Sequence, residues 1–216
     1  MRDLVKSGKV LVNSKPVSDP AFKADPETDS ITVGGKAFGY SEYIYIMLNK
    51  PKGVVSASRS PGEKTVIDLV PPEFKRNGLF PAGRLDKDTT GFVLITDNGD
   101  FAHEILSPKK HVVKTYIACL DRAIDSENLE KFRTGVVLED GYECLPAEIK
   151  VLSEDGKTVE IKLREGKYHQ IKRMAAACRS HVNELHRCAM GNLFLDDSLQ
   201  QGECRLLSEE ELALIK

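Results

Sequence analysis

Short apolar runs separated by turn residues characterise the chain from residue 42 onward. The runs at 43–48 and 92–96 are almost continuously apolar, which is typical of central strands covered on both faces of a sheet. More mixed runs that are also expected to form strands lie at 54–57, 112–120, 147–152, 158–163 and 182–190. This part of the chain therefore predicts a sheet-rich domain.

Helical periodicity is limited to a few short segments. Residues 101–106 follow a strong turn, and Asp100 is expected to cap the helix they form. Residues 125–134 and 169–179 repeat apolar side chains at helical spacing, and the second of these carries basic residues on its opposite face. The sequence Ser-Glu-Glu-Glu at 208–211 has the spacing of a capping box. Because strands and helices do not alternate regularly, the pattern predicts an α+β fold with a largely antiparallel sheet.

The first forty residues are expected to form a small separate unit. A short helix at 2–7 and strands at 10–12 and 30–33 are separated by turn residues. This segment has few apolar residues, so it is not expected to fold alone. We therefore divide the chain into residues 1–40 and 41–216.

Composition and charge limit the kinds of protein that this sequence can represent. The chain has 216 residues, of which 41% are hydrophobic and 30% charged, as in ordinary globular proteins. No apolar run approaches the roughly 20 residues of a membrane-spanning helix, so we expect a cytoplasmic protein. The net charge of −2 excludes a field that attracts nucleic acid over the whole molecule. Basic residues do gather at 50–52, 109–114 and 167–179, and these clusters form an RNA surface only if the fold unites them around one cleft.

The cysteines and histidines give little sign of a metal site. The five cysteines are odd in number and form no C-x-x-C pair, which indicates free thiols. His181, His186 and Cys188 match no standard metal-binding spacing. We expect these histidines to be satisfied in a strand or to face RNA, and no metal to be bound.

The stretch GRLDKDTTG at 83–91 contains two aspartates that either brace a turn or carry chemistry. Asp86 and Asp88 both suit a turn before a buried strand, but a rigid strand is also a good support for a reactive carboxylate. Lys172, in the stretch LREGKYHQIKRM, is a cation that could orient Asp86 and balance its charge. Tyr116, in the stretch KTY, can pack in a core, stack on a base or assist a proton transfer. The sequence has no nucleotide-binding glycine motif, nucleophile elbow or H-E-x-x-H motif, so we expect a reaction without a cofactor.

Four stretches, taken in order, carry a resemblance to a known family. They are KPKG at 50–53, GRLDKDTTGFVLITDNG at 83–99, KTY at 114–116 and EGKYHQIKRM at 165–174. Together they resemble the RsuA family of ribosomal RNA pseudouridine synthases, over nearly the whole chain from residue 43 onward. The resemblance implies the pseudouridine synthase fold, a mixed, mainly antiparallel sheet with flanking helices and a central RNA-binding cleft.

The resemblance also implies a division of roles among the candidate residues. Asp86 would be the catalytic aspartate, Tyr116 would lie against the target base, and Lys172 would pair with the carboxylate. Asp86 would either attack the anomeric carbon of a flipped-out uridine or remove the neighbouring sugar proton, and no cofactor or metal would be needed. The expected RNA-binding residues are Arg84, Lys50, Lys52, Lys114, Lys167, His169, Gln170 and Arg173.

The implied substrate is small-subunit (16S) ribosomal RNA, free or in a ribosomal assembly particle, bound by a monomer. Two alternatives stay open: the same chemistry on large-subunit (23S) RNA, and a catalytically silent RNA-binding assembly protein. Residues 6–35 are similar to the second half of an S4-type RNA-binding domain. The start of such a domain is missing, so we expect a truncated module that binds RNA weakly.

Overall fold

The computed structural model describes residues 2–25, 28–38, 41–107, 110 and 112–216. The chain divides into two compact units, Met1–Tyr43 and Ile44–Lys216. Among the described residues, no helix is both long and apolar enough to span a membrane.

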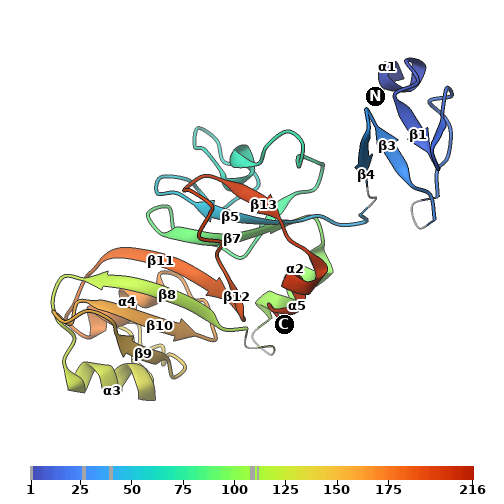
Figure 1. Cartoon of the computed structure of the whole chain (residues 1–216). Helices are drawn as coiled ribbons and strands as arrows, with labels where there is room; N and C mark the ends of the chain where they lie inside the picture. The colour runs from blue at the N-terminus through green and yellow to red at the C-terminus, as the bar shows by residue number, and fades with distance from the viewer. Residues whose placement is uncertain (1, 26–27, 39–40, 108–109, 111) are drawn as a thin grey trace. The chain divides into compact units, whose positions relative to one another are not determined.

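The smaller unit is a helix followed by a small antiparallel sheet with strand order β2-β1-β3-β4 (Figure 1). The elements are α1 (Arg2–Lys6), β1 (Val10–Val12), β2 (Lys15–Pro16), β3 (Ile31–Val33) and β4 (Lys36–Phe38). Val5, Val10 and Val12 are its buried apolar side chains among the residues described. The predicted helix and the strands at 10–12 and 30–33 are present, whereas β2 and β4 were too short to be predicted from periodicity.

The larger unit is built on a nine-stranded sheet (Figure 1). Seven of its strands follow the order β13-β5-β7-β11-β8-β10-β9, and the other two, β6 and β12, pair with β7 and β11. All the strand pairs are antiparallel except β7 with β11, so the sheet is mixed and mainly antiparallel, as predicted. The strands are β5 (Tyr45–Lys50), β6 (Phe80–Ala82), β7 (Thr90–Thr96), β8 (Lys114–Leu120), β9 (Glu148–Val151), β10 (Thr158–Leu163), β11 (Val182–Met190), β12 (Leu193–Phe194) and β13 (Cys204–Leu206).

Side-chain caps fix where three helices of this unit begin. Ser208 forms a capping box with Glu211 in α5, as the sequence indicated, and Asp125, which was not predicted as a cap, accepts a hydrogen bond from Asn128 N–H in α3. The cap expected at Asp100 is wrong, because Asn98 accepts the bond from Phe101 N–H and Asp100 lies inside the first turn. The helices are η1 (Val66–Leu69, a 3-10 turn), α2 (Gly99–Leu106), α3 (Ser126–Thr134), α4 (Gln170–Ala177) and α5 (Glu209–Ala213).

The strand expected at 54–57 does not form. Val55 makes a single bridge to Thr65, and Val54 and Ser56 are buried. The Ser56 hydroxyl donates to the carbonyl of Leu85 and accepts from its N–H, at 2.9 and 3.1 Å. The segment therefore supports the loop that carries Asp86 instead of extending the sheet.

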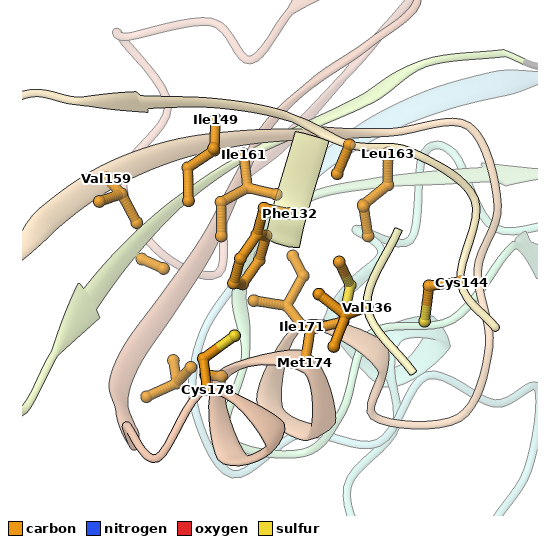
Figure 2. Packing of buried hydrophobic residues seen from close by; sticks show 14 of the residues in the cluster. Phe132, Val136, Cys144, Ile149, Val159, Ile161, Leu163, Ile171, Met174 and Cys178 are labelled. Carbon is orange, nitrogen blue, oxygen red and sulfur yellow. The ribbon is translucent and has the colours of Figure 1, made fainter. Parts of the chain in front are cut away.

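A hydrophobic core holds α3 and α4 against strands β8 to β11. Figure 2 shows Phe132 of α3 pointing into the space between strand residues such as Ile161 and α4 residues such as Met174. These three side chains are at most 2% exposed, and burying one of them fully contributes about 1.5–3 kcal/mol. This packing fixes α4, so that its other face can present basic side chains at a set position.

The parallel contact between β7 and β11 joins the two halves of the sheet. Its register consists of two pairs, Thr90 with His186 and Gly91 with Arg187. Gly91 has a φ of 101°, and a Cβ placed there would lie 2.3 Å from the carbonyl oxygen of Arg187. Only glycine therefore allows this approach, and the approach brings the loop before β7 close to α4 and β8.

Candidate active site

Asp86 lies in the loop between β6 and β7, where it lines a small pocket. The loop closes through a turn in which Thr89 N–H donates to the carbonyl of Asp86 at 3.1 Å. Leu85, the preceding residue, is buried and held by Ser56. The Asp86 side chain is 26% exposed, so it is shielded by the protein but still open to a ligand.

Lys172 of α4 links both aspartates of this loop. Its Nζ lies 3.1 Å from Oδ2 of Asp86 and 2.6 Å from Oδ1 of Asp88. Partial burial alone lowers the pKa of Lys172, but the hydrogen bonds and charges of Asp88 and Asp86 outweigh it and raise this pKa. The hydrogen bond from Lys172 is the main cause that lowers the pKa of Asp88. Asp88, to which the family resemblance assigned no role, thus shares the cation with Asp86.

His169 also contacts the Asp86 carboxylate. Its Nε2 lies 3.5 Å from Oδ1 of Asp86, in the same pocket. The residue has a φ of 48°, in the left-handed region, at the position that caps α4. This backbone geometry turns the ring toward the Asp86 carboxylate, a contact that the sequence did not indicate.

Lys50 supports the Asp86 loop through hydrogen bonds to backbone carbonyls. Its side chain is completely buried at the end of β5. The Nζ donates to the backbone carbonyls of Thr89, Pro51 and Lys87 at 2.7, 3.1 and 3.3 Å. Desolvation lowers the pKa of this ammonium to about 8. This position does not suit the RNA contact expected from the sequence, since the charge is used to hold the loop.

Both polar and apolar side chains line the pocket. Leu85, Leu163, Ile171 and Leu185 contribute the apolar lining. Tyr116 of β8 also lines it, half-buried between two hydrophobic clusters. Such a slot suits a flat ring held against a tyrosine, with a carboxylate beside it.

Arg84 and Lys167 lie on the rim of the pocket with exposed side chains. Among the described residues, the Arg84 guanidinium has no acidic partner within ion-pair distance. The Lys167 Nζ lies over the ring of Tyr142, 4.8 Å from its centroid. Both cations are therefore placed where a phosphate near the pocket could reach them.

Gln170 is buried and takes part in a hydrogen-bond network within the protein instead of an RNA-binding surface. Its amide donates to Oε1 of Glu165 at 2.6 Å and accepts from Lys167 N–H at 2.9 Å. Glu165 also accepts from Tyr142 Oη and Leu145 N–H, both at 2.8 Å. Gln170 is 4% exposed, so it does not suit the predicted RNA contact. Together with Glu165 it fixes the loop before α4.

Three further predicted RNA contacts lie away from the pocket. Lys52 is exposed but paired with Glu184, and Arg173 is paired with Asp140. Lys114 is buried, and desolvation followed by the nearby Arg187 charge lowers its pKa to about 8. Residues 109 and 111 of the basic cluster at 109–114 lie outside the described residues.

No metal centre is evident in the described part of the chain, which contains no group of three or more His, Cys, Asp or Glu side chains placed as ligands. His186 instead shares a hydrogen bond with the hydroxyl of Thr90, with 2.9 Å between Nδ1 and Oγ1. Burial lowers the pKa of this imidazole. The described cysteines are all free thiols.

The sequence profile of a family described as RNA pseudouridylate synthase matches residues 44–177. These residues include β5, the Asp86 loop, Tyr116 and α4, and thus every candidate catalytic residue. The match therefore covers most of the larger unit and every residue that lines the pocket except Leu185.

Relatives of similar length support the same grouping. An uncharacterized RNA pseudouridine synthase of Bacillus subtilis, YtzG, is 46% identical over 100% of this chain and 91% of its own. Ribosomal small subunit pseudouridine synthase A of Escherichia coli is 39% identical over 98% of this chain and 90% of its own. The similarity thus extends through both units.

Solved structures agree in fold. A crystal structure of a pseudouridylate synthase has a TM-score of 0.75 and 33% identity, and the match covers 100% of this chain and 92% of the other. The archaeal box H/ACA sRNP Nop10-Cbf5 complex matches 85% of this chain and 57% of its own with a TM-score of 0.57 and 16% identity. That second likeness concerns the fold alone.

Proposed function

The chain belongs to the RNA pseudouridine synthase family, and we propose that it converts a uridine of small-subunit (16S) ribosomal RNA into pseudouridine, with Asp86 as the catalytic carboxylate. The observation that carries the proposal is the pocket that joins Asp86, Tyr116 and His169, with Lys172 paired to Asp86. The loop before β7, strand β8 and helix α4 each contribute to it. RNA binding alone needs only charge and stacking groups, so it does not explain this convergence.

The reaction is an isomerisation that balances within the substrate. The bond between N1 of uracil and C1′ of ribose breaks, and a bond between C5 and C1′ forms. The hydrogen on C5 leaves as a proton, and N1 gains one. Asp86 either attacks C1′ or removes the neighbouring sugar proton, and both routes require a carboxylate beside the ribose.

The other residues of the pocket bind and orient the nucleotide. Lys172 holds the Asp86 carboxylate in place, and Tyr116 packs against the uracil ring. The uridine must leave the base stack to enter the pocket, which costs a few kcal/mol. Arg84, exposed on the rim, is placed to hold the phosphate of the flipped nucleotide. We further propose that residues 1–40 form an S4-like module that contributes to RNA binding.

The small-subunit target is supported by the name and similarity of the Escherichia coli relative. The name of the Bacillus subtilis relative specifies no RNA. A large-subunit (23S) target would use the same pocket, since target choice depends on surfaces outside it. Mapping pseudouridines in both ribosomal RNAs from cells with and without this protein separates the two targets.

The mapping experiment has a clear expected result. One or more pseudouridines of 16S RNA should disappear without the protein and return when it is restored. Loss of a 23S modification would contradict the proposed target and keep the proposed chemistry. Unchanged maps, together with tight RNA binding and no product from purified protein, would support the silent assembly protein instead.

A further inference from the structure

Tyr168 presents a large aromatic ring to solvent beside the pocket. Its exposed fraction of 76% is the highest among the large hydrophobic and aromatic side chains that the structure describes. One face of the ring stacks on His169, with 3.8 Å between centroids and 18° between planes. Because so much of the side chain is exposed, the opposite face is open to a ligand.

The backbone on both sides of Tyr168 is fixed. Lys167 N–H donates to Gln170, whose amide is held by Glu165. His169, which follows, occupies the left-handed region with a φ of 48° and begins α4. The exposed ring is therefore held in place before any ligand binds, which reduces the entropy lost on binding.

The ring also lies at a defined place relative to the chemistry. His169 contacts Tyr168 with one face and reaches Asp86 through Nε2, at 3.5 Å. His169 lines the pocket, whereas Tyr168 does not. The His169 ring thus contacts both Tyr168 and the Asp86 carboxylate, and it links the exposed tyrosine to the pocket.

We propose that Tyr168 stacks on the base of a nucleotide adjacent to the target uridine, an inference that rests on the proposed function. When the uridine leaves the stack, the neighbouring bases lose a stacking partner. A preformed aromatic ring at the pocket entrance replaces that partner and holds the RNA strand in register. Stacking on a ring tolerates any base, so Tyr168 contributes affinity and position and leaves the choice of sequence to other contacts.

The test combines Tyr168→Ala with RNA substrates that contain one abasic nucleotide. On intact RNA from the mapped site, Tyr168→Ala should lower affinity by about 5- to 150-fold, the range for loss of one stacked base. Tyr168→Phe, which keeps the ring and removes the hydroxyl, should stay within about twofold. Removing the contacted base should weaken the wild type similarly, and Tyr168→Ala should then add little. If Tyr168→Ala has the same effect on every abasic RNA, the ring only supports His169 and the proposal is wrong.

A second measurement separates this proposal from the proposed function. The chain has no tryptophan, so Tyr168→Trp creates a single fluorescent reporter. A decamer of uridine should quench its emission, and a decamer of abasic ribose phosphates should not. Equal quenching by both would overturn the stacking proposal even if the wild type makes pseudouridine. Quenching by uridine alone, with no pseudouridine formed, would support stacking and contradict the proposed function.

Discussion

Replacing Gly91 with alanine tests whether the contact between β7 and β11 aligns the active site. The new Cβ would lie 2.3 Å from the carbonyl oxygen and 2.8 Å from the nitrogen of Arg187. Both are backbone atoms, so the strands must separate by about 1 Å to reach an ordinary contact distance. The φ of 101° adds about 1–2 kcal/mol for any residue with a side chain, and overpacking adds about 1–3 kcal/mol. The expected loss is about 2–5 kcal/mol in the free energy of unfolding.

The same displacement should reduce activity more than stability alone explains. Asp86 precedes β7, whereas Tyr116 belongs to the other half of the sheet. A misplacement of about 1 Å between reacting groups costs on the order of 100-fold in rate. Urea unfolding and pseudouridine formation by the folded variant provide the two readouts. Gly62→Ala is the matched control, because its φ of 74° is also positive but no atom lies within 4 Å of its Cβ. If the two variants lose the same stability and activity, the junction does not align the site.

Three further predictions concern the supports and the rim of the pocket. The pKa of Lys50 is about 8 in the folded state against 10.5 ordinarily, so between these pH values the unfolded chain binds more protons than the folded one. The free energy of unfolding of the wild type, relative to that of Lys50→Met, should therefore rise by up to about 1 kcal/mol per pH unit between pH 8 and 10.5. Urea titrations at several pH values measure this, and a constant difference would contradict the buried ammonium. Arg84→Ala should reduce the slope of log affinity for RNA against log salt concentration by about one. Arg173→Ala, which removes a residue already paired with Asp140, should leave this slope unchanged. Filter-binding titrations at several salt concentrations measure both slopes, and equal slopes for the two variants would contradict the prediction. Glu165→Gln should lower the free energy of unfolding by about 1–3 kcal/mol, because three donors lose their carboxylate acceptor. Urea unfolding measures this loss, and an unchanged stability would contradict the importance of the network.

The elements with a strong local signal were predictable from sequence. The apolar run of β7 is buried throughout, and the capping box at Ser208 forms as expected. The strand predicted at 54–57 failed because its apolar residues are buried under a loop, which a short run does not distinguish from a strand. Strands such as β6 (Phe80–Ala82) and β13 (Cys204–Leu206) are too short to show any period. Tertiary contacts define them.

The candidate site was predictable in its residues more than in their arrangement. The motifs named Asp86, Tyr116 and Lys172, and the structure brings them to one place. Lys50 and Gln170 were expected to face RNA, whereas both are buried and hydrogen-bonded within the protein. The burial of a polar group depends on partners distant in sequence, and one sequence alone does not reveal them. The same holds for the bond between Asp88 and Lys172, which are 84 residues apart.

Release of tritium from the uracil ring reports directly on the proposed role of Asp86 in the isomerisation. Ribosomal RNA labelled with tritium at C5 of uridine releases label only when C5 bonds to the ribose. Wild-type protein and Asp100→Asn, a control at an exposed aspartate outside the pocket, should release label from 16S RNA at similar rates. Asp86→Asn should bind the RNA and release no label above background. Full release by Asp86→Asn would contradict the account.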